Sequence, residues 1–140
     1  MEEWVEGIAF IILKDGKVLV EKRKMDKKVD PGQIIIPGGH IEKGETPLEA
    51  CKRELKEELG IECKRIDFVV RLQYIHPAEK QNINYYLCRD IIGEIETLEA
   101  EEVFWIDPVS EKSVLSTETN DDVDLRALEK MLELVKNEEK

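Results

Sequence analysis

Three glutamates, Glu54, Glu57 and Glu58, lie close together in a charged stretch of the sequence. If this stretch is helical, at 100° per residue the three side chains share an arc of about 100° on one face. Their mutual repulsion disfavours joint ionisation, and a bound divalent cation removes that cost. Oxygen ligands at this density suit Mg²⁺ or Mn²⁺, which can bridge phosphate oxygens and activate water for attack at phosphorus. The spacing therefore predicts cation-dependent phosphate chemistry.

Signals for a helix surround these glutamates. Thr46 is an N-cap candidate, Pro47 takes the first helical position, and Glu49 completes the pattern of a capping box. Gly60 is suited to end the helix. The same helix carries an apolar stripe that we expect to be buried, formed by Leu48, Cys51, Leu55 and Leu59. The glutamates should therefore lie at the edge of the core, where they can line a cleft.

The remaining segments predict a sheet that accompanies this helix. Strands are expected over residues 4–13 and 18–20, with an Asp-Gly turn between them, and over residues 33–36, 61–74, 83–88 and 102–106. We expect a loop over the basic residues 22–28, a stop at residues 37–39 and a turn within residues 90–93. Apolar residues spaced through the last part of the chain predict an amphipathic C-terminal helix. This order predicts an α/β (α+β) fold with a mixed sheet sandwiched between helices, in a single domain over residues 1–140.

Composition narrows the class of partner. The 140 residues carry a formal net charge of −11, with 41% hydrophobic and 38% charged residues. A negative field of this size argues against long nucleic acids and anionic membranes, which need basic surfaces. The three cysteines show no CxxC spacing, the first residues are acidic, and the apolar run at 8–13 is too short to span a bilayer. We therefore expect a soluble, cytoplasmic protein.

The acidic helix is part of a longer pattern. Helices rich in glutamate are often solvated, with pairs such as Arg53 and Glu57 one turn apart. Here, however, residues 39–61 match the pattern G-x5-E-x7-R-E-U-x-E-E-x-G-U without a gap, through Gly39, Glu45, Arg53, Glu54, Leu55, Glu57, Glu58, Gly60 and Ile61. This is the Nudix box. The chain resembles the Nudix hydrolases, MutT-like members included, and Pro37-Gly38 and the segment 102–105 extend the likeness. The resemblance implies a mixed sheet between helices.

The resemblance also implies an activity and a set of residues for it. The family hydrolyses a pyrophosphate bond in a nucleoside diphosphate linked to another group. The ligands implied for Mg²⁺ or Mn²⁺ are Glu54, Glu57, Glu58 and the Gly38 carbonyl, which would join them through a tight glycine turn. Glu54 would also orient or deprotonate the attacking water, Arg53 would hold the glutamates in place, and Glu45 would be a support or an occasional ligand.

Further positions follow from MutT-type relatives. Another metal ligand lies on a loop after the box, where an ungapped extension reaches Glu99, with Glu101 and Glu102 as close alternatives. Arg23 corresponds to a residue that contacts the nucleotide in those relatives. The alternative is a surface arginine with no role in binding.

Two more features remain open from the sequence. Residues Asn120, Asp121 and Asp122 resemble the position where purine-specific relatives bind the base edge; alternatively, Asn120 is an N-cap and the acids favour the helix dipole. The two histidines, His40 and His76, are interpreted as surface residues because no nucleophilic triad accompanies them.

Several functions are compatible with this pattern. The length and residues 120–122 favour an ordinary or oxidised nucleoside triphosphate as the small-molecule nucleotide substrate. ADP-ribose or a dinucleoside polyphosphate is the alternative within the class, and a nucleotide-binding module without turnover is the alternative outside it. A Ca²⁺-binding structural protein fails because the chain has no DxDxDG loop. Homodimers are common in the family, and nothing in the sequence identifies an interface.

Overall fold

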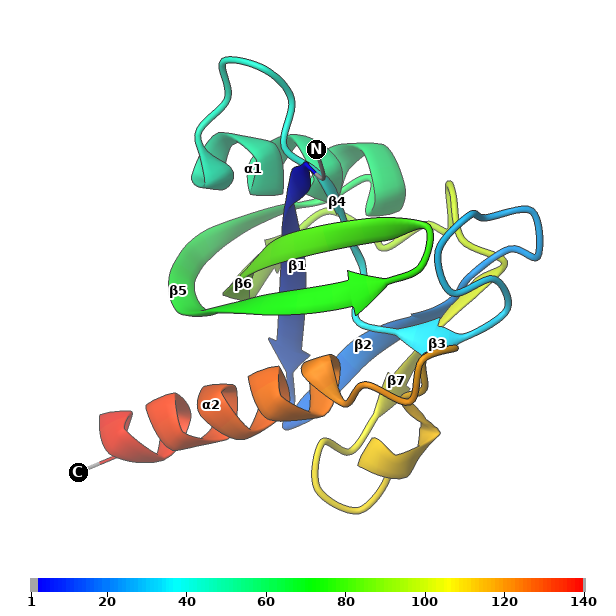
Figure 1. Cartoon of the computed structure of the whole chain (residues 1–140). Coiled ribbons are helices and arrows are strands. Elements are labelled where there is room, and N and C mark those ends of the chain that lie inside the picture. Colours follow the sequence, from blue (N-terminus) through cyan, green and yellow to red (C-terminus); the bar gives the residue numbers. More distant parts are fainter. Residues whose placement is uncertain (1–2, 140) are drawn as a thin grey trace.

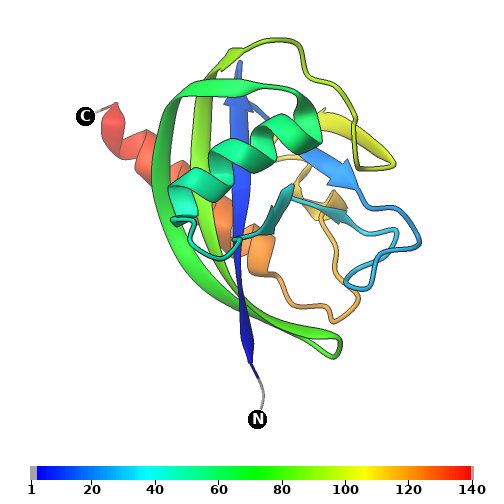
Figure 2. The same ribbon diagram turned by 90° about the horizontal axis from the view of Figure 1, so that it is seen from above.

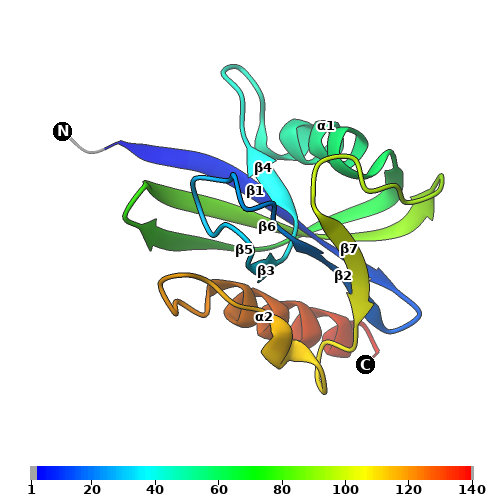
Figure 3. The same ribbon diagram turned by 90° about the vertical axis from the view of Figure 1, so that its right-hand side faces the viewer.

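A seven-stranded mixed sheet lies between two helices (Figures 1 and 3). The structure is a computed structural model that describes residues 3–139, so the first two residues and the last residue of the predicted domain lie outside the described residues. The elements are β1 (Trp4–Lys14), β2 (Lys17–Lys22), β3 (Ile34–Ile35), β4 (Gly38–His40), α1 (Pro47–Leu59), β5 (Glu62–His76), β6 (Glu79–Ile92), β7 (Glu102–Ile106), a 3₁₀ turn (Lys112–Val114) and α2 (Val123–Glu138).

Strand β1 is the centre of this arrangement. It pairs antiparallel with β2 and β4 and parallel with β6, which makes the sheet mixed. Its side chains alternate between two cores: Ile8, Phe10 and Ile12 pack on the side of α1, and Ala9 and Ile11 on the side of α2. Such a strand, buried on both faces, reads as a continuous apolar run. The predicted fold class, a mixed sheet sandwiched between helices, is therefore confirmed.

The helices cover opposite faces of the sheet. Helix α1 lies across β1 and β5 (Figure 2), while α2 packs against β5 from the other side. Thr46 and Glu49 form the predicted capping box, and Gly60 ends the helix in a left-handed conformation. Leu48 was predicted to be buried, but it is 39% exposed, and Ala50 packs in the core instead. Neither helix in the described part of the chain has the length and apolar character needed to cross a bilayer.

Two hairpins frame the sheet. The β1–β2 turn is as predicted, with Asp15 and Gly16 both at positive φ, the conformation of a two-residue type I′ turn. The β5–β6 hairpin is longer than predicted. The turn expected within residues 90–93 comes at the end of that range, because Ile91 and Ile92 still pair with the start of β5 and the chain bends at Gly93.

The segment before α1 also differs from the prediction. Instead of a stop and a tight glycine turn, Gly38 and Gly39 form β4 and pair with Ala9 and Ile8 of β1. Neither glycine has a positive φ. A Cβ on Gly38 would lie 2.1 Å from the Ile8 carbonyl oxygen, so close backbone approach explains this glycine better than turn geometry does. Strand β4 thereby brings the Gly38 backbone to the wall of the cavity described below.

Candidate functional site

Two glutamates of α1 meet a third from a distant loop. Carboxylate oxygens of Glu54, Glu58 and Glu99 all lie within 4.8 Å of one another. Glu57 lies outside this group: its side chain is 49% exposed and forms an ion pair with Arg53 at 3.0 Å. The structure thus brings together three of the four predicted glutamate ligands. Such a group of oxygens has the composition that Mg²⁺ and Mn²⁺ favour.

Backbone hydrogen bonds hold the loop that carries Glu99. The Glu96 amide donates to the Leu59 carbonyl, and the Leu98 amide donates to the Glu58 carbonyl. Both carbonyls belong to the last turn of α1, where the helix itself provides no donor for them. The amide of Glu101 donates to the Lys22 carbonyl of β2. The loop is therefore fixed at both sides of Glu99, which reaches the group.

The guanidinium of Arg53 organises the other side of the site. It donates to both carboxylate oxygens of Glu45 at 2.7 and 2.9 Å and to Glu54 at 2.7 Å. It also donates to the His40 carbonyl at 2.9 Å, which ties the helix to the end of β4. The Arg53 hydrogen bonds lower the pKa of Glu45 from its ordinary value to about 2, with help from the Glu42 amide. This geometry is what a side chain that holds the glutamates in place requires.

Gly39 leaves the space that Glu54 occupies. A Cβ on Gly39 would lie 2.4 Å from the carboxyl carbon of Glu54. The Glu54 side chain is buried there, and burial raises the pKa of its carboxyl group while Arg53 opposes the shift. The buried position of the Glu54 carboxylate therefore requires a glycine at position 39.

Two buried carboxylate oxygens in this region have no hydrogen-bond partner. They are Oε2 of Glu58 and Oε1 of Glu21, a β2 residue that the sequence analysis did not single out. Burial raises the pKa of Glu58, and the neighbouring Glu21 carboxylate raises it further. Burial also raises the pKa of Glu21. Oxygens that are buried, acidic and without partners fit a divalent cation, which would supply the missing positive charge.

A cavity of about 370 Å³ opens beside these carboxylates. Glu54, Glu58 and Glu99 line it together with Gly38. The basic side chains of Arg23, Lys27 and Lys28 also line it, so both signs of charge face the same space. The Arg23 Nε donates to the Val29 carbonyl at 2.8 Å, which holds this predicted nucleotide contact against the loop that follows β2.

The predicted base-binding residues lie elsewhere. Asn120, Asp121 and Asp122 are not among the residues that line the cavity, and both aspartates pair with Arg126, at 3.0 and 3.1 Å. The alternative N-cap role of Asn120 is wrong, because the residue has a φ of 62° and the N-cap position of α2 is Asp122, whose side chain makes no capping hydrogen bond.

Asp124 lines the cavity instead, from the first turn of α2. Its carboxylate accepts hydrogen bonds from the Tyr85 hydroxyl at 2.6 Å and from the Ile36 amide at 2.9 Å. Burial raises the pKa of Asp124 to about 6. From the sequence, an acid near a helix start is interpreted as a contact with the helix dipole. Only the pairing of distant segments reveals that Tyr85 and the Ile36 amide bind its carboxylate.

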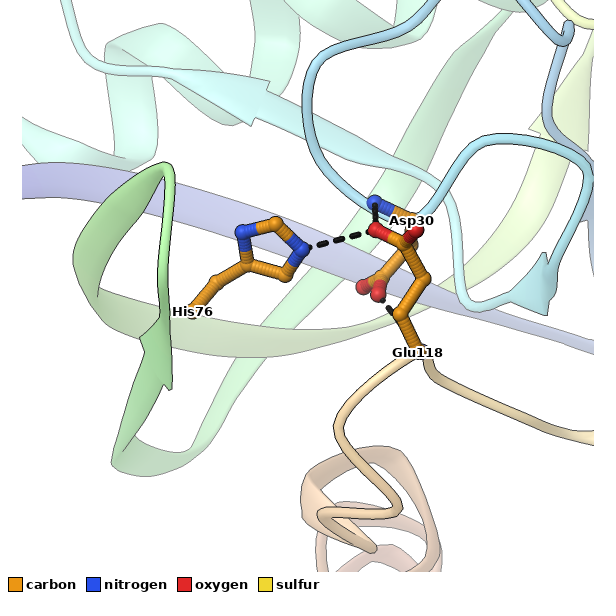
Figure 4. A group of neighbouring side chains, drawn as sticks. All are labelled: Asp30, His76 and Glu118. Atoms are coloured by element: carbon orange, nitrogen blue, oxygen red, sulfur yellow. Dashed lines mark hydrogen bonds and ion pairs between the residues drawn. The ribbon is translucent and has the colours of Figure 1, made fainter.

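Three other side chains, Asp30, His76 and Glu118, form a second group, as Figure 4 shows. Of these, Asp30 lines the cavity. The Glu118 amide donates to Asp30 at 2.9 Å, and the Asp30 amide donates to Glu118 at 3.0 Å. The Tyr74 hydroxyl donates to Asp30 at 2.8 Å. We call this group the loop clasp, because it joins the loop after β2, the end of β5 and the loop before α2.

His76 belongs to the loop clasp, so its interpretation as a surface residue is wrong; it is 8% exposed. The Ala78 amide donates to His76 Nδ1 at 3.0 Å, which leaves the ring proton on Nε2, 2.7 Å from Glu118. A metal on Nε2 would shift that proton to Nδ1, where it would face the Ala78 amide. The clasp therefore fits hydrogen bonding better than it fits a metal. His40, by contrast, is exposed as predicted.

Comparison with known proteins relates this geometry to a family. The profile of the NUDIX domain matches residues 5–127. The chain is 39% identical over 74 residues to an 8-oxo-dGTP diphosphatase of Haemophilus influenzae. These 74 residues are 53% of this chain and 54% of that protein. It is 30% identical over 104 residues to a CTP pyrophosphohydrolase of Escherichia coli, covering 74% of this chain and 76% of that protein. The chain thus spans about half the length of the first relative.

A solved structure agrees over most of the chain. A MutT NUDIX hydrolase from Burkholderia pseudomallei superposes with a TM-score of 0.76 at 27% sequence identity. The superposition covers 92% of this chain and 98% of the other.

The bond between Glu45 and Arg53 generates a pH-dependent prediction. Because the folded pKa of Glu45 is about 2, below its ordinary value of 4.5, the pair stabilises the fold above about pH 4.5. This stabilisation is lost as the pH falls from about 4.5 towards 2. We expect the difference in unfolding free energy between wild type and Glu45→Gln, from urea denaturation, to shrink over this range. A control, the exposed Glu94→Gln, should follow the wild type, and a Glu45 difference that stays constant with pH would contradict the assignment.

The loop clasp generates a second prediction. Asp30→Ala leaves the Tyr74 hydroxyl and the Glu118 amide without their acceptor and places alanine at a φ of 52°. We expect a loss of about 3 kcal/mol in unfolding free energy. Asp30→Asn keeps an acceptor oxygen and tolerates this backbone, so it should lose less than about 1.5 kcal/mol. Urea denaturation checks both values, and equal stability of the two variants would show that the clasp does not hold the loops.

Proposed function

The chain belongs to the NUDIX domain family, and from this membership we propose that it hydrolyses a pyrophosphate bond in an ordinary or oxidised nucleoside triphosphate with the help of Mg²⁺ or Mn²⁺. The observation that carries the proposal is the meeting of Glu54, Glu58 and Glu99 at a cavity that basic side chains also line. The names of the two bacterial relatives, an 8-oxo-dGTP diphosphatase and a CTP pyrophosphohydrolase, support a triphosphate substrate.

We propose that the cation binds to Glu54, Glu58, Glu99 and the Gly38 carbonyl. The partnerless Glu58 oxygen and the hard oxygen donors support this choice. A bound divalent cation neutralises phosphate charge and makes a water molecule a stronger nucleophile at neutral pH. Glu57 remains a proposed ligand, although its carboxylate would first have to break its ion pair with Arg53 in order to bind the cation.

The protein's own side chains would then act in distinct ways. Glu54 is the proposed base: its burial raises its pKa, which favours acceptance of a proton from water. Arg53 holds Glu54 in one orientation and is itself held by Glu45. Arg23 lines the cavity, where a guanidinium can bind a phosphate oxygen.

The apolar part of the cavity lining is the proposed base site. Ile36, Ile83 and Tyr85 give it apolar walls, and Asp124 lies among them. We therefore propose Asp124, in place of residues 120–122, as the side chain that contacts the base edge. Its hydrogen bonds to Tyr85 and Ile36 hold the carboxylate in one position, which recognition of a planar base requires.

Two further proposals concern the whole chain. We propose that residues 1–140 form a single domain, because both helices pack on one sheet and each contributes to one of its two cores. We also propose a cytoplasmic location, which the free thiols of Cys51, Cys63 and Cys88 support.

The test is hydrolysis of a substrate panel by wild type and Glu58→Gln in the presence of Mg²⁺. The panel contains the ordinary and oxidised triphosphates, ADP-ribose and a dinucleoside tetraphosphate, with products separated by ion-exchange chromatography. We expect a triphosphate to be the best substrate, and loss of a cation ligand to lower kcat on the order of 100-fold. Glu62→Gln, an exposed acid paired with Lys56, is the matched control and should retain the wild-type rate.

Three outcomes would contradict the proposal in different ways. Equal rates for wild type and Glu58→Gln would remove the cation assignment. Preference for ADP-ribose or the dinucleoside compound would correct the substrate. Tight nucleotide binding without hydrolysis across the panel would identify a binding module. Hydrolysis in ¹⁸O-labelled water then identifies the phosphorus that is attacked.

A further inference from the structure

Glu21 is a carboxylate at a position where the fold otherwise places core residues. It lies in β2 between β3 and β7, pairs with Ile35 and Val103, and is 5% exposed. Along β2, Val20 packs in the core beside α2 and Leu19 in the core beside α1. Because side chains alternate along a strand, Glu21 shares the α1 side with Leu19. This is the side from which α1 directs Glu54 and Glu58.

The Glu21 carboxylate lacks the partners that a buried acid needs. Its Oε1 atom is buried and accepts no hydrogen bond. Arg23 and Lys27 act on it electrostatically, but burial has the larger effect. An acid in this situation is strongly unfavourable unless a positive charge or a proton joins it. The group therefore points to a ligand.

A second buried carboxylate oxygen without a partner belongs to a glutamate of α1. Oε2 of Glu58 is the other buried carboxylate oxygen without a partner among residues 3–139. Of the charged groups that act on Glu58, Glu21 has the largest effect, and Glu99 acts on both. Glu58 and Glu99 also belong to the group around Glu54. Glu21 is not one of the three residues of that closely spaced group and does not line the cavity; it is a buried acid whose charge acts on two members of the group.

We propose that Glu21 is a further cation-binding carboxylate of the site, and that with Glu58 and Glu99 it lets the protein hold one more divalent cation than the group around Glu54 holds. This inference rests on the proposed cation-dependent function. The alternative occupant of the same space is a proton shared between the buried acids, which would leave cation binding independent of Glu21. Counting bound cations distinguishes the two.

The experiment is a titration of the metal-free full chain with Mn²⁺, in which electron paramagnetic resonance measures the free ion. Wild type is compared with Glu21→Gln, which keeps the size of the side chain and removes its charge. Glu62→Gln is the matched control, because Glu62 is an exposed acid at the start of β5, paired with Lys56 and outside the proposed site. We expect Glu21→Gln to bind one fewer Mn²⁺ per chain, or to bind the weakest ion at least about tenfold less tightly. The control should bind as wild type does.

Thermal unfolding provides an independent measurement. Without metal, Glu21→Gln should have a higher Tm than wild type, because a buried charge has been removed. Saturating Mn²⁺ should raise its Tm less than it raises that of wild type. If Glu21→Gln does not fold, Glu21→Asp replaces it in the experiment. This variant keeps the charge but has a side chain shorter by one methylene. It should bind the additional ion at least about fivefold more weakly than wild type does.

The results separate this inference from the proposed function. If wild type binds no Mn²⁺ at all, the cation-dependent function itself is wrong. If wild type binds Mn²⁺ and Glu21→Gln binds the same number with the same affinities, only the role of Glu21 is wrong. Where Glu21→Asp is used instead, Mn²⁺ binding equal to that of wild type would likewise show that only the role of Glu21 is wrong.

Discussion

The burial of several carboxylates around the end of α1 is the constraint on which the rest of the site depends. Glu54 and Glu21 are buried, and Glu58 has a buried oxygen without a partner. The guanidinium of Arg53 contacts Glu54 on one side of this group. Charges of one sign at such close range repel one another strongly in a medium of low dielectric constant. A fold that accepts this arrangement needs a compensating positive charge, which is a proton or, as we propose, a divalent cation.

The surrounding structure is arranged around that need. Strand β4 runs through glycines, so that its backbone approaches β1 and leaves room for Glu54. The loop after β6 is bonded to the end of α1 and to β2, which brings Glu99 across to Glu58. The loop clasp holds together two loops that both contribute to the cavity lining, through Asp30 and Thr117. The net charge of −11 would act in the same sense at longer range: it would repel a long polyanion, and under the proposed function a short nucleotide would bind where cations reverse the local field.

Local signals in the sequence predicted the parts of the site that lie within one element. Thr46, Glu49 and Gly60 set the limits of α1, and the spacing of Glu54 and Glu58 put both on one face. Strand β7 was predicted at its observed limits of Glu102–Ile106, because a short apolar run ends at Asp107-Pro108. What depends on distant pairing could not be predicted in this way. Glu21 reads as the polar end of a strand, and it becomes buried only because β3 and β7 pair on either side of it. His76 and Asp124 were missed for the same reason, since loops and strands far apart in the chain enclose them.

The most direct test of this account is a crystal structure of the protein grown with Mn²⁺ and a non-hydrolysable nucleoside triphosphate, with anomalous diffraction recorded to locate the ion. The account predicts a strong anomalous peak in coordination distance of Glu54, Glu58 and Glu99, with the phosphates beside it and the base near Asp124. A nucleotide bound in the cavity with no ion at these glutamates, or with its ion held elsewhere, would contradict it.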